Sequence, residues 1–107
     1  MSRERIFSKY FNIPRYGGEI DVKVFIEYEA TNWDQENTGD IDVIDAWLSR
    51  DRLVHYDSNK LAEVAMTQSE IDSAQSWLDQ TPLDFFHDAA FQNECDIYNE
   101  PTLFLQP

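Results

Sequence analysis

Apolar residues occupy every second position from Ile20 to Ala30. Successive side chains of a β-strand point to opposite faces, so a repeat of two marks a strand with one buried face. The positions in between carry mostly charged side chains, namely Asp21, Lys23, Phe25, Glu27 and Glu29. The pattern therefore predicts a strand with one face on a core and the other largely in water, which is typical of an antiparallel sheet.

Two further strands are predicted after this one. The stretch from Thr31 to Asp40 is polar, and Ile41 to Leu48 is apolar enough to return as the second strand of a long hairpin. Arg52 to Tyr56 is predicted as a third strand, followed by a turn at Asp57-Ser58-Asn59. We therefore expect an antiparallel sheet of about three strands.

Helix signals appear in the C-terminal part of the chain. Thr67-Gln68-Ser69-Glu70 has the spacing of a capping box, so a helix is predicted to begin at Thr67. Thr81-Pro82 predicts the end of this helix and the start of a second short one. Pro82 is expected at the first position of that helix, which reaches to about Phe91. Both helices are expected on one face of the sheet. The signals fade over residues 92–107, which are predicted as an extended tail.

The N-terminal segment, residues 1–16, is predicted as an amphipathic arm or short helix. Pro14 prevents a helix from continuing, and four apolar residues fall on one helical stripe, namely Ile6, Phe7, Tyr10 and Phe11. The basic residues among them also have the appearance of a transit peptide, which the shortage of serine disfavours. With 107 residues and no boundary signal, the chain is expected to form one α+β domain.

Charge is unevenly distributed along the chain. The chain has 21 acidic and 8 basic residues, a formal charge of −13, and no lysine or arginine follows Lys60. Such a charge repels nucleic acids and anionic membranes and favours a basic partner. Cys95 is the only cysteine, and no apolar run is long enough to span a membrane. We therefore expect a cytoplasmic protein that binds neither nucleic acid nor membrane directly.

Carboxylates at helical spacing are the main candidates for function. Asp72 and Asp79 are predicted on about the same side of the first helix, about 10 Å apart along its axis. Asp84 and Asp88 are i and i+4 neighbours, about 5 to 6 Å apart. Carboxylates at such intervals on rigid helices can imitate the phosphates that a nucleic-acid-binding protein recognises. The partner-binding residues predicted beside these four are Glu63 and Glu70, which extend the row, and Trp33 as a hot spot.

A plainer interpretation of the same residues is a solvated face that keeps a small protein soluble. Other kinds of site have only partial signals. The loop from Asp34 to Asp45 places oxygen-bearing side chains as an EF-hand calcium loop does, but an alternating strand precedes it where an EF-hand needs a helix. His55, His87 and Cys95 lack the surroundings of a catalytic motif or a metal-ligand spacing. We therefore expect no metal, no cofactor and no enzyme activity.

Three segments resemble small proteins of tailed bacteriophages, namely Gly18 to Val24, Gly39 to Val43 and Thr67 to Ile71. The shared pattern is a strand, an acidic hairpin loop, a second strand and a capped helix, and it covers about residues 18–78. The resemblance lends no catalytic residues. It implies a host-cytoplasmic setting, in which small acidic phage proteins act as inhibitors of host nucleic-acid enzymes or defence complexes.

The function expected from these features is inhibition of a basic host protein by occupation of its nucleic-acid site, that is, by DNA mimicry. The alternative is a structural or assembly protein that forms homo-oligomers. In that case a strand edge, or the aromatic arm around Phe7 and Phe11, pairs with another copy.

Overall fold

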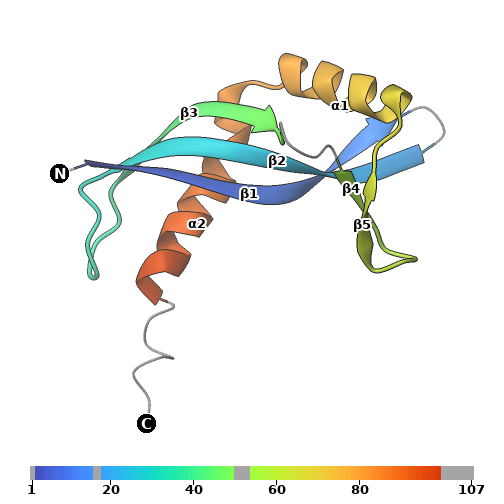
Figure 1. Ribbon diagram of the computed structural model, residues 1–107. Coiled ribbons are helices and arrows are strands. Elements are labelled where there is room, and N and C mark those ends of the chain that lie inside the picture. Colours follow the sequence, from blue (N-terminus) through green and yellow to red (C-terminus); the bar gives the residue numbers. More distant parts are fainter. Residues whose placement is uncertain (1, 16–17, 50–53, 100–107) are drawn as a thin grey trace, which may run out of the picture.

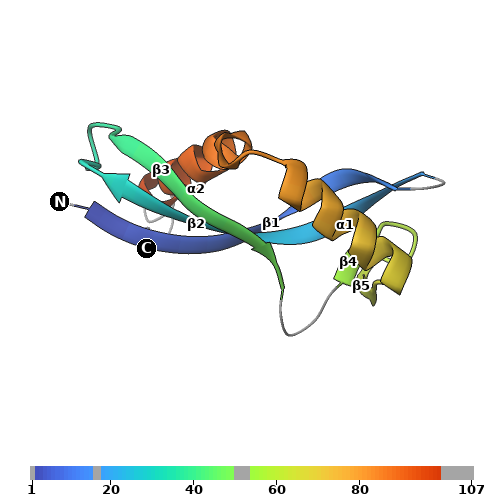
Figure 2. The same cartoon turned by 90° about the horizontal axis from the view of Figure 1, so that it is seen from above.

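The fold combines one antiparallel sheet with a layer of helices, in a computed structural model that describes residues 2–15, 18–49 and 54–99. The elements in chain order are β1 (Ser2–Arg15), β2 (Gly18–Thr31), β3 (Asp40–Leu48), β4 (Val54–Asp57), β5 (Ala62–Ala65), α1 (Gln68–Gln80), the short 3-10 helix η1 (Leu83–Phe86) and α2 (His87–Asn99). Figures 1 and 2 show α1 over one end of the long β1–β2 pair and α2 toward its other end. The predicted α+β class is therefore confirmed.

β2 is the central strand of the sheet. It pairs along its whole length with β1, and its other edge is shared by β3, which pairs with residues 24–31, and β4, which pairs with Asp21 and Val22. In the part of the chain that the structure describes, β5 pairs only with β4, and the sheet has five strands instead of the predicted three or so. The predicted hairpin of β2 and β3 is confirmed, with a bulge that inserts Ile44 opposite the step from Glu27 to Tyr28.

The N-terminal segment is a strand and not the predicted helix or arm. The fourteen residues of β1 pair with β2 from Ser2 opposite Thr31 to Arg15 opposite Gly18. Two facts explain the difference. An isolated helix of about nine residues is marginal in water, and this segment is rich in aromatic and β-branched residues that favour a strand once a partner strand exists. The prediction failed because that partner lies outside the segment.

The short strands could be predicted only in part. β4 begins at Val54, and the first residues of the predicted third strand, Arg52 and Leu53, lie outside the described residues. The turn predicted at Asp57-Ser58-Asn59 is present, and the Asp57 carboxylate accepts a hydrogen bond from the Asn59 amide at 2.9 Å. β5 was not predicted, because its four residues, Ala62-Glu63-Val64-Ala65, are too few to show a repeat.

The predicted start of α1 is confirmed. The Thr67 hydroxyl accepts a hydrogen bond from the Glu70 amide at 3.3 Å, and the Glu70 carboxylate accepts one from the Thr67 amide at 2.9 Å. Thr81 ends the helix, and Pro82 precedes η1 instead of occupying the first position of a helix. The next helix does not stop near Phe91, as predicted, but runs on to Asn99. Residues 92–99 are thus helical, whereas 100–107 lie outside the described residues.

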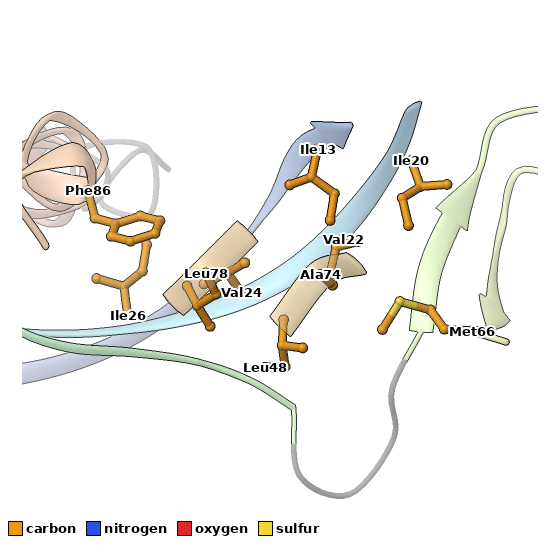
Figure 3. Close-up of a cluster of buried hydrophobic side chains, with 10 residues drawn as sticks. All are labelled: Ile13, Ile20, Val22, Val24, Ile26, Leu48, Met66, Ala74, Leu78 and Phe86. Atoms are coloured by element: carbon orange, nitrogen blue, oxygen red, sulfur yellow. The ribbon is translucent and has the colours of Figure 1, made fainter. Parts of the chain in front are cut away.

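The core lies between the helices and the face of β2 that carries its alternating apolar residues. Figure 3 shows its main cluster, in which strand residues meet α1 and η1: Ile13, Ile20, Val22, Val24, Ile26, Leu48, Met66, Ala74, Leu78 and Phe86. A smaller cluster, of Tyr28, Ala30 and Ala90, lies between β2 and α2. Within the described residues, no helix covers the opposite face of the sheet, which we call the open face. Among the described residues, no helix has the length and hydropathy needed to cross a membrane.

Candidate protein interface

The helical layer exposes two of the predicted carboxylates on α1. Because Ala74 is fully buried on the core side, Asp72 and Asp79 lie on the solvent side of this helix. Each carboxylate accepts a hydrogen bond from the glutamine four residues earlier, at 3.0 Å from Gln68 and 2.8 Å from Gln75. These pairs restrict the carboxylates to a few orientations on a rigid helix.

Asp84 and Asp88 are also exposed, but they belong to different elements. Asp84 lies in the first turn of η1 and Asp88 in the first turn of α2, where carboxylates are favoured by the positive end of the helix dipole. The chain changes direction between α1 and α2 (Figure 1), so the four carboxylates follow a bent path. Asp96, which was not predicted, repeats the α1 arrangement and accepts a hydrogen bond from Gln92 at 2.8 Å. Asp96 could have been predicted from the sequence, because a glutamine also lies four residues before Asp72, Asp79 and Asp96. We call Asp72, Asp79, Asp84, Asp88 and Asp96 the helical carboxylates.

Glu63 and Glu70 do not extend this row. Glu70 is 7% exposed, closes the N-terminal cap of α1 and lies 3.7 Å from the imidazole of His55. Glu63 is half-buried on β5, where it accepts hydrogen bonds from the Tyr10 hydroxyl at 2.6 Å and the Lys23 ammonium at 3.1 Å. Burial and this hydrogen bond raise the pKa of Tyr10 to about 12. Both carboxylates therefore serve contacts within the chain.

Glu94 is a further carboxylate that the structure withdraws from the surface. It is fully buried on α2 and accepts hydrogen bonds from the Arg5 guanidinium at 2.9 and 3.3 Å and from the Tyr28 hydroxyl at 2.7 Å. Asn93 donates to the same hydroxyl at 2.9 Å. Burial would raise the pKa of Glu94, but the hydrogen bonds from Arg5 and Tyr28 prevail and lower it. This network joins β1 and β2 to α2.

Trp33, the predicted hot spot, anchors the loop between β2 and β3. Its ring stacks on Tyr98 with 6.0 Å between centroids and meets the edge of Phe91 at 5.2 Å, both on α2. Its indole N–H donates to the Asp40 carbonyl at 3.0 Å. These contacts account for a half-buried tryptophan within a polar loop without a partner protein.

The loop that resembles an EF-hand has another organisation. β2 precedes it in place of a helix, and the Asp34 carboxylate accepts hydrogen bonds from the amides of Glu36 at 2.8 Å and Asn37 at 2.6 Å. These bonds lower the pKa of Asp34. Asp40 to Asp45 belong to β3, where successive side chains point to opposite faces. Within the described ranges, no group of three or more suitable side chains could hold a metal ion.

The two histidines and Cys95, for which no catalytic role was predicted, lie in different surroundings. His87 is exposed beside Asp88, with 3.8 Å between Nδ1 and the carboxylate, whereas His55 is half-buried next to Glu70. Cys95 lines a small hollow together with Trp33 and Tyr98. The structure thus brings Cys95 to the aromatic anchor of the loop.

The open face carries a surface that was not predicted. Across β1, β2 and β3 one row consists of Glu4, Glu29 and Asp42, and the next row consists of Ile6, Glu27 and Asp45. The third row contains Phe25 and Trp47, whose rings are stacked with 6.1 Å between centroids. This surface depends on the pairing of three strands. The surface was not predicted because the N-terminal segment, which forms β1, was expected to be a helix or arm.

No known family model matches the chain, and no curated protein or solved structure matches it significantly.

Proposed function

We propose that the protein binds a basic protein through its helical carboxylates and inhibits a nucleic-acid-binding host protein by occupying its nucleic-acid site. The observation that carries the proposal is the exposure of Asp72, Asp79, Asp84 and Asp88 on helices that contain no lysine or arginine. A basic partner would meet only negative or neutral side chains on this layer.

The arrangement of the carboxylates supports a phosphate-like role. Asp72 and Asp79 are about 10 Å apart along the axis of α1, and their glutamine partners orient them. A basic groove that docks onto such a row would release counterions as it does on binding nucleic acid, so binding should weaken steeply with salt. Glu63, Glu70 and Glu94 are occupied by the fold and take no part in the proposal.

The proposal can be tested by reversing Asp72, Asp79, Asp84 and Asp88 to lysine in one variant. We expect the variant to lose a basic partner that the wild-type chain captures from host lysate at low salt and releases at high salt. A double variant, Asp72→Lys with Asp79→Lys, can be matched against Glu19→Lys with Glu36→Lys, which make the same charge change at exposed positions outside the helices. Unchanged capture and unchanged salt dependence in the quadruple variant would contradict the proposal.

Homo-oligomer formation is the second candidate, and the edge of β1 favours it. Among the described residues, β1 pairs only with β2, so fourteen residues of strand edge are open. In contrast, Lys9 and Pro14 on this strand count against edge pairing, because natural sheets use lysine and proline to protect their edges. The aromatic arm is not available for pairing, because Phe7 meets Tyr28 at 5.8 Å and Phe11 meets Phe86 at 5.2 Å inside the chain. Light scattering separates the two candidates, since assembly requires a stable oligomer.

A further inference from the structure

The open face of the sheet has the composition of a docking surface. The helices α1 and α2 cover the other face (Figures 1 and 2), and within the described residues no helix covers β1, β2 and β3 on this side. Glu63 of β5 contacts Tyr10 and Lys23 at one end of this face, away from the rows of Glu27 and Glu29. Ile6 is 60% exposed there. Beside it, Phe25 and Trp47 lie nearly parallel, with 12° between the ring planes, and both are only half-buried.

Carboxylates oppose one another directly at one end of the open face. Glu29 on β2 lies opposite Glu4 on β1 and opposite Asp42 on β3, and Glu27 lies opposite Asp45. Opposed side chains on neighbouring antiparallel strands have Cβ atoms about 4.5 to 5.5 Å apart, and like charges at this separation destabilise a sheet. The fold therefore tolerates an unfavourable arrangement that a bound cation would relieve.

The described basic side chains of the sheet do not neutralise these carboxylates. Arg3, Arg5 and Lys9 are in register with Ala30, Tyr28 and Val24, and so lie on the helix-covered face. On the open face, Lys23 is paired with Glu63 at 3.1 Å. The acidic rows thus adjoin an aromatic stack without a described basic side chain in either row.

We propose that the open face is a second docking surface and that it binds an arginine-bearing segment of a basic protein. A guanidinium group stacks on an indole ring and pairs with carboxylates in two parallel hydrogen bonds, so the rows around Trp47 match its chemistry better than that of an ammonium group. A second copy of the chain would present the same negative charge and be repelled. Nucleic acid is disfavoured for the same reason.

This surface is separate from the helical carboxylates, because the two lie on opposite layers. The inference therefore holds whether or not the helical carboxylates meet a partner. It also assigns functions to side chains that the core does not need, namely Phe25, Trp47 and the opposed carboxylates.

The proposal can be tested by nuclear magnetic resonance titration of the isotope-labelled chain with an octaarginine peptide, with octalysine as the comparison. We expect the largest shifts at the Trp47 indole and at the amides of Glu27, Glu29 and Asp42, with octaarginine bound more tightly. Shifts confined to α1, η1 and α2 would overturn the proposal and support the helical carboxylates instead. Equal binding of the two peptides with a Trp47 indole that does not move would overturn it as well.

Binding measurements on variants test the proposal without relying on the chemical shifts. Trp47→Ala should weaken octaarginine binding about three- to tenfold, the range expected for loss of a cation–π contact. Glu29→Gln should weaken binding too, yet raise the melting temperature, because it removes like-charge repulsion on both sides of β2. A residue with a structural role alone would not weaken binding while it stabilises the fold.

The matched control replaces Asp72, Asp79, Asp84 and Asp88 with asparagine, which removes four charges from the helical layer. We expect this variant to keep the Trp47 indole shift. If it loses that shift and Glu29→Gln keeps it, the proposal is wrong. If lysine reversals on the helices leave the captured host protein bound while the sheet variants release it, the helical proposal fails and the open face stands.

Discussion

Glu94 is a charged residue that is fully buried. Its carboxylate is 0% exposed, and such burial of a charge is unfavourable unless hydrogen bonds and an opposite charge compensate for it. Arg5 and Tyr28 supply both, and the Arg5 pKa is raised by its hydrogen bond to Glu94. Because the groups come from β1, β2 and α2, the network helps to position α2 on the sheet.

Glu94→Gln should lower the free energy of unfolding by about 2 kcal/mol at neutral pH, because the ion pair with Arg5 is lost and the remaining hydrogen bonds have a neutral acceptor. The pKa of Glu94 is lowered from its ordinary value of 4.5, so its contribution to stability is complete above pH 4.5 and is lost as the pH falls through the lower folded value. Urea unfolding of both chains at several pH values measures this. The difference between them should shrink below pH 4.5.

Asp96→Asn is the control for this prediction, because Asp96 is an exposed acid on the same helix. It should leave stability nearly unchanged at every pH. A difference between the wild type and Glu94→Gln that stays constant down to strongly acidic pH would contradict the assigned ionisation of Glu94.

Trp33 tests whether an aromatic residue in a polar loop is an anchor or a hot spot. Trp33→Ala should destabilise the chain by about 2 to 3 kcal/mol, because it removes ring contacts with Phe91 and Tyr98. Thermal unfolding measures this loss. Binding of a basic partner by the remaining folded protein should be unaffected. A large loss of affinity with unchanged stability would restore the hot-spot interpretation.

Among the elements, β2 and α1 could be predicted from their own residues, whereas β1 could not. The alternation in β2 and the capping box of α1 are local patterns that specify their structure within a few residues. The sequence of β1 has a helical stripe of apolar residues and also aromatic and β-branched residues that favour a strand, and pairing with β2 decides between the two. Glu94 is a charged residue on the buried face of α2, so this face did not have an apolar pattern and the helix was predicted too short.

Variants of the capping box can show whether Glu70 has a structural role or a binding role. Thr67→Ala should lower the free energy of unfolding by about 1 kcal/mol, because one amide at the start of α1 loses its acceptor. Glu70→Gln removes the charge but keeps a side chain that can accept from the Thr67 amide, so it should cost less than Thr67→Ala. Partner binding should persist in Glu70→Gln. A loss of binding in this variant would indicate that Glu70 is one of the partner-binding carboxylates.

For the whole molecule, the two-layer arrangement sorts the charges onto separate surfaces. The helical carboxylates face solvent on one side, and the opposed carboxylates of the open face lie on the other, while Arg5 is taken into the interior. Both surfaces therefore present excess negative charge, consistent with the formal charge of −13. Self-repulsion of this size works against the compact state.

Salt should therefore stabilise the isolated protein. Screening shortens from about 30 Å at 0.01 M salt to about 8 Å at 0.15 M, which weakens repulsion between the acidic surfaces. We expect the melting temperature to rise over this range of sodium chloride. The variant with asparagine at positions 72, 79, 84 and 88 should show a smaller rise. A melting temperature that falls with salt would indicate that paired charges, such as Lys23 with Glu63, dominate the electrostatics.

Local patterns in the sequence were enough to predict some of the elements. These are β2, the β2–β3 hairpin, the start of α1 and the exposure of Asp72 and Asp79, because a repeat, a turn or a cap acts over a few neighbouring residues. The other features depend on contacts between elements. β1 and β5 formed where partner strands were present, Glu94 became buried against Arg5, and Glu29 came to face Glu4 and Asp42. Such contacts join residues far apart in the chain, so their energies appear only after the strands have paired.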